Sequence, residues 1–163
     1  MIRMEVVGVR VELPANTPVV VLREQEGRHR LLPILIGNPE ASAIHNAIQG
    51  LVPPRPLTHD LIVNLLVLLG AELEAVVITE VREHTFYAEL HLRSGSQPLI
   101  LSSRPSDALA LAVRTGTPVF ANESLLDEVA LDAPDELAEQ EEEAILDEFR
   151  DFLDEIKPED FGG

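Results

Sequence analysis

Two short stretches of the sequence place arginine, proline and a carboxylate directly ahead of apolar helical runs. The first is "PPRPLTHD", residues 53–60, and the second is "RPSD", residues 104–107. The N-terminus of a helix presents free backbone N–H groups and about half a positive charge, so it attracts anions, and phosphate above all. A neighbouring arginine adds a forked donor for the same anion. The two stretches therefore indicate a candidate anion site.

The first stretch offers Arg55, His59 and Asp60. Asp60 lies in the first turn of a helix that we expect to begin at Thr58 as N-cap, where a carboxylate also complements the helix dipole without further function. The prolines around Arg55 stiffen the approach to the helix more than capping requires. Arg55 and His59 are thus candidates for binding and proton transfer, and capping remains the alternative for Asp60.

The second stretch repeats the pattern with Arg104, Ser106 and Asp107. Pro105 sets φ for the first helical turn, and Asp107 lies within that turn. The cation of Arg104 is unfavourable beside the positive end of a helix, so it needs an anionic partner. That partner is either a ligand or an internal carboxylate, for which the sequence offers Glu40, Asp60 and Asp107.

The chemistry that these groups can support is phosphodiester hydrolysis, which needs a clamp for the phosphoryl charge and a group that orients water. In this hypothesis the catalytic residues are His59, Asp60 and Asp107. The substrate-binding residues are Arg55, Arg104 and Ser106. A hard cation, Mg or Mn, would be held by Glu40, Asp60 and Asp107, although helix N-termini repel cations. The sequence contains no zinc motif and no glycine-rich phosphate loop.

The elements that must position these residues follow from the hydrophobic pattern. Strands are expected over 2–13, 17–23, 30–36, 73–83, 85–94 and 98–102, with a short strand at 117–121. Helices are expected from Asn38 as N-cap to Gly50, over 58–70, over 105–115 with Gly116 closing it, and from Asn122 as N-cap. The helix over 58–70 is apolar nearly all round, which predicts burial.

The order of three strands and a helix occurs twice, and the anchors keep their spacing. Thr17 to Gly27 and Thr85 to Gly95 each span ten positions, and Pro39 to Gly50 and Pro105 to Gly116 each span eleven. The predicted fold class is α+β, with two pseudo-repeated βββα units and a buried helix inserted between them.

Charge divides the chain into two parts. Residues 1–123 carry 13 acidic and 10 basic side chains, whereas residues 124–163 carry 16 acidic and 2 basic ones, within a total net charge of −17. Residues 134–157 show one apolar stripe on an acidic helix, which predicts docking on the body or on a neighbouring subunit, or else a regulatory helix. We therefore predict a domain over 1–130 and an acidic helical tail over 131–163.

The 163 residues contain no cysteine, and their N-terminus shows no signal-peptide pattern. The longest apolar run, residues 65–71, is too short to span a bilayer. These features predict a cytoplasmic protein without membrane association.

Four blocks in this order, "LPILIG", "PPRPLTHDL", "TFYAEL" and "RPSDALALA", closely resemble the bifunctional nuclease family over roughly residues 4–130. The resemblance implies a compact α+β domain, and nuclease activity on RNA and DNA is attributed to some plant members. It implies no agreed set of catalytic residues.

Two functions follow as expectations. The first is a nuclease, for which the lack of a basic run and of stacking aromatics predicts weak, salt-sensitive binding of RNA or single-stranded DNA. The second is a non-catalytic homo-oligomeric module that binds a small anion or a protein partner and is regulated by the acidic tail.

Overall fold

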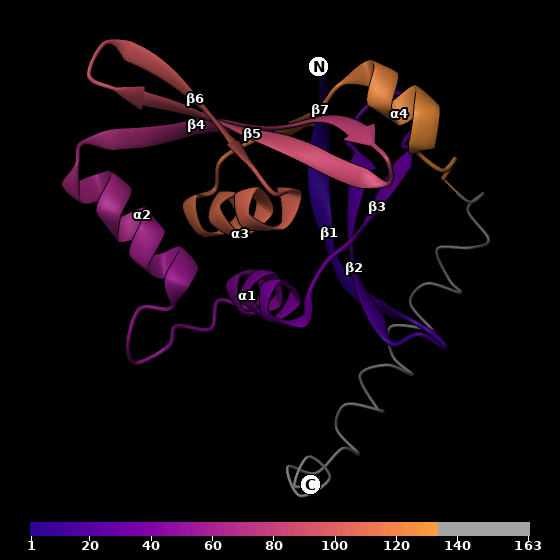
Figure 1. The fold of residues 1–163 in the computed structure, drawn as a ribbon, viewed down its shortest axis with the longest axis horizontal. Helices are drawn as coiled ribbons and strands as arrows, with labels where there is room; N and C mark the ends of the chain where they lie inside the picture. The colour runs from indigo at the N-terminus through magenta and orange to yellow at the C-terminus, as the bar shows by residue number, and fades with distance from the viewer. Residues whose placement is uncertain (134–163) are drawn as a thin grey trace, which may run out of the picture. The chain divides into compact units, whose positions relative to one another are not determined.

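The computed structural model describes residues 1–133, so the acidic helix expected over 134–157 lies outside the described residues. Within residues 1–133 no helix has the length and apolar character needed to cross a membrane. The elements, shown in Figure 1, are β1 Ile2–Glu12, β2 Thr17–Glu24, β3 Leu31–Leu35, α1 Asn38–Ile48, α2 Thr58–Leu68, β4 Ala71–Arg82, β5 Thr85–Ser94, β6 Gln97–Ser103, α3 Pro105–Thr115, β7 Val119–Ala121 and α4 Glu123–Val129.

The strands of the described residues form one seven-stranded sheet in the order β3-β2-β1-β7-β4-β5-β6. All neighbours are antiparallel except β4 and β7, which are parallel. Because β7 is antiparallel to β1 and parallel to β4, the first strands of the two units run in opposite directions on either side of β7. This is the arrangement that a two-fold pseudosymmetry axis perpendicular to the sheet produces. It confirms the predicted α+β class and the repeated βββα order.

The helices that close the two units, α1 and α3, pack against each other on one side of the sheet (Figure 1). The segment "ALALA" of α3 is buried throughout, from Ala108 to Ala112. Its alanines allow the close approach of α1 and the sheet, while Leu109 fills the core with no exposed surface. The helix begins and ends where the sequence predicts, because Pro105 starts it and Gly116 ends it in the left-handed conformation at φ 68°.

The N-caps of the first two helices differ from those predicted. The cap of α1 is Gly37 rather than Asn38, and the cap of α2 is Leu57 rather than Thr58. At α2 the backbone N–H of Leu57 donates to Asp60 Oδ2 over 2.9 Å. Because the carboxylate of Asp60 satisfies that donor, Thr58 can lie at the first helical position. Asn122 caps α4 as expected.

The expected burial of the helix over 58–70 is wrong. His59 is its one buried residue, and Ile62, Val63 and Leu66 are partly buried against the core. The outward positions of α2 and its C-cap are exposed, and they are Leu61, Leu65, Val67, Leu68 and Leu69. The helix is exposed because it lies at the edge of the domain, where only one of its sides packs against α3 and β4 (Figure 1).

Candidate functional site

The two predicted helix starts meet through His59 and Asp107. His59 lies in the first turn of α2 and Asp107 in the first turn of α3, and Nε2 of the imidazole is 3.0 Å from Oδ1 of the carboxylate. A carboxylate can only accept, so Nε2 carries the proton and donates it. The imidazole is largely buried, with 11% of its side-chain surface exposed. This bond holds the orientation of the ring, and in the neutral form of the imidazole it fixes the tautomer that carries the proton on Nε2.

Arg104 is the N-cap of α3 and binds two carboxylates at once. Its Nε donates to Asp107 Oδ2 over 2.7 Å and its Nη2 to Asp107 Oδ1 over 3.0 Å. The same Nη2 donates to Glu40 Oε1 of α1 over 3.1 Å. The side chain of Arg104 is nevertheless 65% exposed. The internal partners that the sequence offered for this cation are thus present, and they link α1 to α3.

The charges of this cluster shift the pKa of two of its members, Asp107 and Arg104. Burial alone would raise the pKa of Asp107, but hydrogen bonds from Arg104 and His59 outweigh burial and hold that pKa below its usual value. The hydrogen bond to Asp107, together with the negative charges of Asp107 and Glu40, raises the pKa of Arg104. At Arg104, two carboxylates face one guanidinium. An incoming phosphate must therefore compete with Asp107 and Glu40 for Arg104.

Asp60 belongs to a different cluster from the one predicted. Arg114 Nε donates to Asp60 Oδ1 over 2.7 Å, and Arg114 Nη1 donates to the carbonyls of Ala43 and Ala110 over 3.1 and 2.9 Å. The hydrogen bond from Arg114, followed by that from the Leu57 N–H, lowers the pKa of Asp60. Asp60 therefore links the start of α2 to the end of α3. Its two carboxylate oxygens bond to Arg114 and to the Leu57 N–H, and not to His59.

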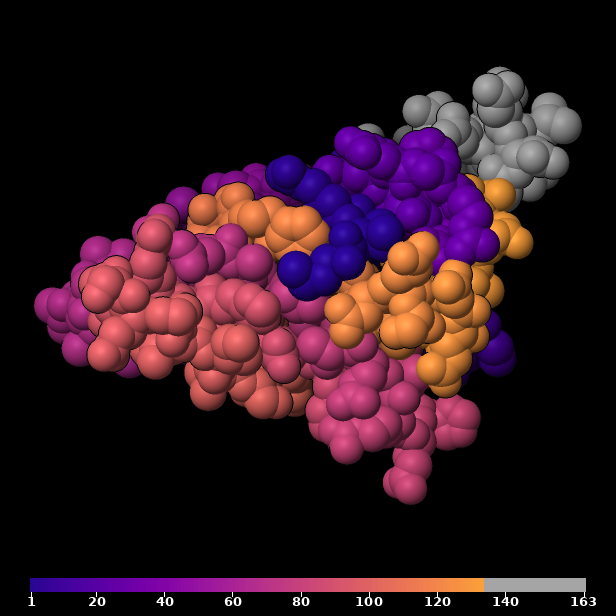
Figure 2. Space-filling model, turned by 90° about the horizontal axis from the view of Figure 1, so that it is seen from above, coloured from indigo at the N-terminus to yellow at the C-terminus, as the bar shows by residue number. Residues whose placement is uncertain are grey.

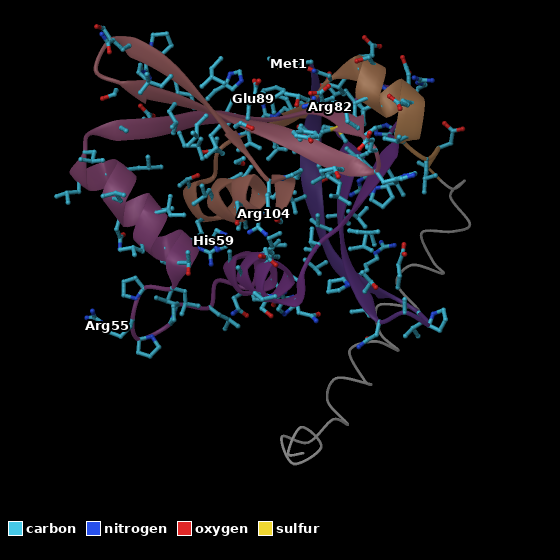
Figure 3. All side chains as sticks on the ribbon, viewed as in Figure 1. Met1, Arg55, His59, Arg82, Glu89 and Arg104 are labelled. Atoms are coloured by element: carbon cyan, nitrogen blue, oxygen red, sulfur yellow. The ribbon has the colours of Figure 1, made fainter. Side chains whose placement is uncertain are left out.

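Arg55 does not join Arg104. It lies in the loop before α2, and its exposed side chain points away from both His59 and Arg104 in Figure 3. The predicted clamp of two arginines is therefore absent from this arrangement. Ser106, by contrast, lies beside Arg104 and is 7% exposed.

Arg104 and Ser106 line an open cleft of about 640 Å³ between the end of β3, the β4–β5 turn and the start of α3. Sequence reasoning missed two of its residues, His84 and Phe86, which come from the β4–β5 region. His84 has a positive φ of 62°, and a turn histidine followed by an aromatic strand residue was the available signal. Arg104 is the one formally charged side chain in this lining.

The carboxylates predicted as metal ligands do not gather around one point. No group of three metal-binding side chains occurs among residues 1–133. The guanidinium of Arg104 bonds to both Glu40 and Asp107, and Asp60 is bonded to Arg114. A cation between Glu40 and Asp107 would have to displace an arginine. This donor set does not fit Mg or Mn as arranged.

Comparison with known proteins identifies a domain family and several relatives of the chain. The sequence model of the bifunctional nuclease domain matches residues 20–134. An uncharacterized protein of Mycobacterium tuberculosis strain H37Rv is 45% identical over 162 residues, which cover 97% of this chain and 96% of that protein.

Plant relatives are more distant. Bifunctional nuclease 2 of Oryza sativa subsp. japonica is 28% identical over 121 residues, and bifunctional nuclease 1 of Arabidopsis thaliana is 27% identical over 114 residues. These matches cover 72% and 68% of this chain but 37% and 35% of the plant proteins. The chain belongs to the bifunctional nuclease domain family.

Proposed function

We propose that this protein is a nuclease that hydrolyses phosphodiester bonds of RNA or single-stranded DNA at the start of α3. The observation that carries the proposal is the 3.0 Å hydrogen bond between His59 and Asp107, which is held beside the exposed guanidinium of Arg104. Membership of the bifunctional nuclease domain family supports the same reaction class.

In this proposal His59 moves the proton. With Nε2 donating to Asp107, Nδ1 is the basic nitrogen of the neutral ring, and it accepts a proton from the attacking water or hydroxyl. Asp107 fixes the tautomer and stabilises the imidazolium that forms. Asp60 takes no part in the proton transfer, because its two oxygens bond to Arg114 and to the Leu57 N–H.

Arg104 binds the phosphate on its exposed side, between the cleft that it lines and the His59–Asp107 pair, which is not part of that lining. Its guanidinium is exposed and has five donors, so it can turn one edge to a phosphate oxygen while the other edge keeps a carboxylate. Ser106 lies beside it in the cleft lining and is the second polar contact. Since the cluster offers one cation against two carboxylates, affinity for nucleic acid is low, and it falls as salt is added.

The test uses the purified full chain with labelled single-stranded RNA and DNA, in EDTA and with Mg²⁺ or Mn²⁺ added. His59→Gln lowers the cleavage rate by about 10²-fold to 10⁴-fold, the usual contribution of a general base. Arg104→Ala weakens substrate binding, while Arg55→Ala serves as the matched arginine control and leaves cleavage unchanged. Circular dichroism checks the fold of each variant. Equal cleavage by wild type and His59→Gln would identify a contaminating nuclease and refute the proposal.

A second candidate function is the non-catalytic module, in which Arg104 acts as an ion-pair latch between α1 and α3. Two observations favour it: the carboxylates of Glu40 and Asp107 already occupy Arg104, and the outer side of α2 is apolar and exposed. The same assay separates the two candidates, because a pure module binds without cleaving any substrate in any metal.

A further inference from the structure

The strand β6 forms one edge of the sheet, and its outer side has no strand neighbour among residues 1–133. Six of its seven residues are exposed, and the centre of the strand is Leu99, Ile100 and Leu101. It carries no charged side chain. Natural sheets protect an exposed edge with charges, bulges or short strands, because an open apolar edge pairs with another strand. Apart from Pro98, β6 has none of these.

The backbone groups that β6 presents outward follow from its hairpin. The turn of Gly95 and Ser96 has two residues, so its flanking pair, Ser94 and Gln97, is hydrogen-bonded. Hydrogen-bonded and non-hydrogen-bonded pairs alternate along an antiparallel ladder. Ile100, opposite His91, is therefore a position whose N–H and C=O point away from β5. Pro98 and Ser102 point outward in the same way, and at Pro98 the missing N–H costs no bond to β5.

A second unpartnered apolar surface lies at the same end of the molecule. The outer stripe of α2 consists of Leu57, Leu61, Leu65 and Leu68, which follow i, i+4, i+8 and i+11 and are all exposed. No charged residue occurs between Asp60 and Glu72. In Figure 1 α2 and the β5–β6 hairpin both lie at the left, and in Figure 2 the hairpin is on the surface at the left.

We propose that the occupant of this surface is a second copy of the chain, joined through antiparallel pairing of β6 with β6 around a two-fold axis at Ile100. In this register Ile100 exchanges two hydrogen bonds with Ile100 of the partner subunit. Leu99 lies opposite Leu101 of the partner subunit, and the Ser102 N–H donates to the carbonyl of the partner's Pro98. The pairing makes the two sheets continuous across the axis.

The sequence of β6 favours an identical strand over a different partner. Around Ile100 the residues read Leu-Ile-Leu in either direction, so an identical antiparallel strand places leucine against leucine on the inner face. A surface without charges gives a charged partner no electrostatic contact, and the net charge of −17 disfavours an anionic membrane.

The exposed area also suits a dimer. Leu99 and Leu101 lie on the same face as the buried Leu90 and Leu92, so pairing extends the core face of the sheet. The three apolar residues of β6 and the exposed apolar side chains of α2 each offer on the order of 100 Å². Their sum approaches the roughly 800 Å² per partner of a standard stable interface.

The test begins with the mass of the full-length protein at micromolar concentration, measured by light scattering after gel filtration. The proposal predicts at least twice the 17.9 kDa of one chain, and Ile100→Lys, which places two ammonium groups at the axis, reduces the mass to one chain. A wild-type mass of 17.9 kDa would overturn the proposal.

A disulfide experiment tests the register, because the native chain has no cysteine. Ile100→Cys should form an intermolecular disulfide on mild oxidation, since a hydrogen-bonded antiparallel pair has Cα atoms about 5.5 Å apart, within disulfide range. Ser102→Cys is the matched control, since its symmetry mate lies four positions along the strand, about 13 Å away. Equal disulfide yields at the two positions would overturn the pairing.

Discussion

Arg114 and Asp60 are 54 positions apart in the sequence, and their side chains form a 2.7 Å hydrogen-bonded ion pair that joins the end of α3 to the start of α2. Arg114 is 11% exposed and also donates to the carbonyls of Ala43 and Ala110. One guanidinium thereby fixes three helices relative to one another. The bond anchors the first turn of α2, in which His59 also lies.

Asp60→Asn should therefore destabilise the fold by about 1–3 kcal/mol at neutral pH, the cost of removing one partner of a partly buried, charge-assisted hydrogen bond. The pKa of Asp60 is lowered in the folded state, so its contribution is complete above the unfolded value near 3.8 and is lost as pH falls through the folded value. Urea unfolding at neutral and at strongly acidic pH checks this, and the difference between wild type and variant should shrink in acid. Glu128→Gln, at an exposed carboxylate of α4, should show no such difference at either pH.

The ion pair of Glu24 and Arg30 gives a second prediction, because both side chains are almost fully buried. Arg30 Nε donates to Glu24 Oε2 over 2.8 Å, and Arg30 Nη2 donates to Oε1 over 3.2 Å. Arg30→Met leaves a buried carboxylate without its partner and should cost about 3–5 kcal/mol. Glu24→Leu should cost less, because Arg30 Nη1 still donates to Asp127 Oδ1 over 2.7 Å. The double variant should be clearly less destabilised than the sum of the two. Additive losses in a double-mutant cycle by urea unfolding would contradict a direct coupling.

Much of the fold could be predicted from the sequence, because turns and caps are local signals. Pro105 and Gly116 correctly predict the bounds of the helix over 105–115, and the hydrophobic pattern with the spacing of its anchors predicts the repeated βββα order. The burial of α2 could not be predicted in this way. An apolar pattern indicates that a helix has surface to bury, but it does not show whether that surface is buried within its own domain or against another molecule.

The candidate site was predicted in part, for the same reason. Helix-start chemistry singled out His59 and Asp107, which the fold brings to within hydrogen-bonding distance across 48 positions. It also singled out Arg55, whose side chain points away from the site (Figure 3). The path of the irregular proline-rich loop that carries Arg55 depends on tertiary contacts, which the local sequence does not reveal. Arg114 was missed because a basic residue in the last turn of a helix has an ordinary explanation in the helix dipole.

Gly116 provides a local test of the α3 terminus, next to the ion pair of Arg114. Its φ of 68° is left-handed, and a Cβ at this position would meet no atom within 4 Å. Gly116→Ala should therefore cost about 1 kcal/mol from backbone strain alone, and Gly116→Asn should cost less because asparagine tolerates this conformation. Thermal unfolding measures both. An alanine variant as stable as wild type would show that the left-handed cap contributes nothing.

Glu40 provides the sharpest test of how Arg104 is held. Its carboxylate accepts from Arg104 Nη2 over 3.1 Å and so competes with any phosphate for the guanidinium. Glu40→Gln keeps the shape of the side chain but weakens that competition, so a labelled single-stranded oligonucleotide should bind about threefold to tenfold more tightly, where tenfold corresponds to about 1.4 kcal/mol. Fluorescence anisotropy at fixed salt gives the Kd. Glu128→Gln makes the same change in net charge without touching Arg104, and equal tightening in both variants would assign the effect to overall charge instead of to release of Arg104.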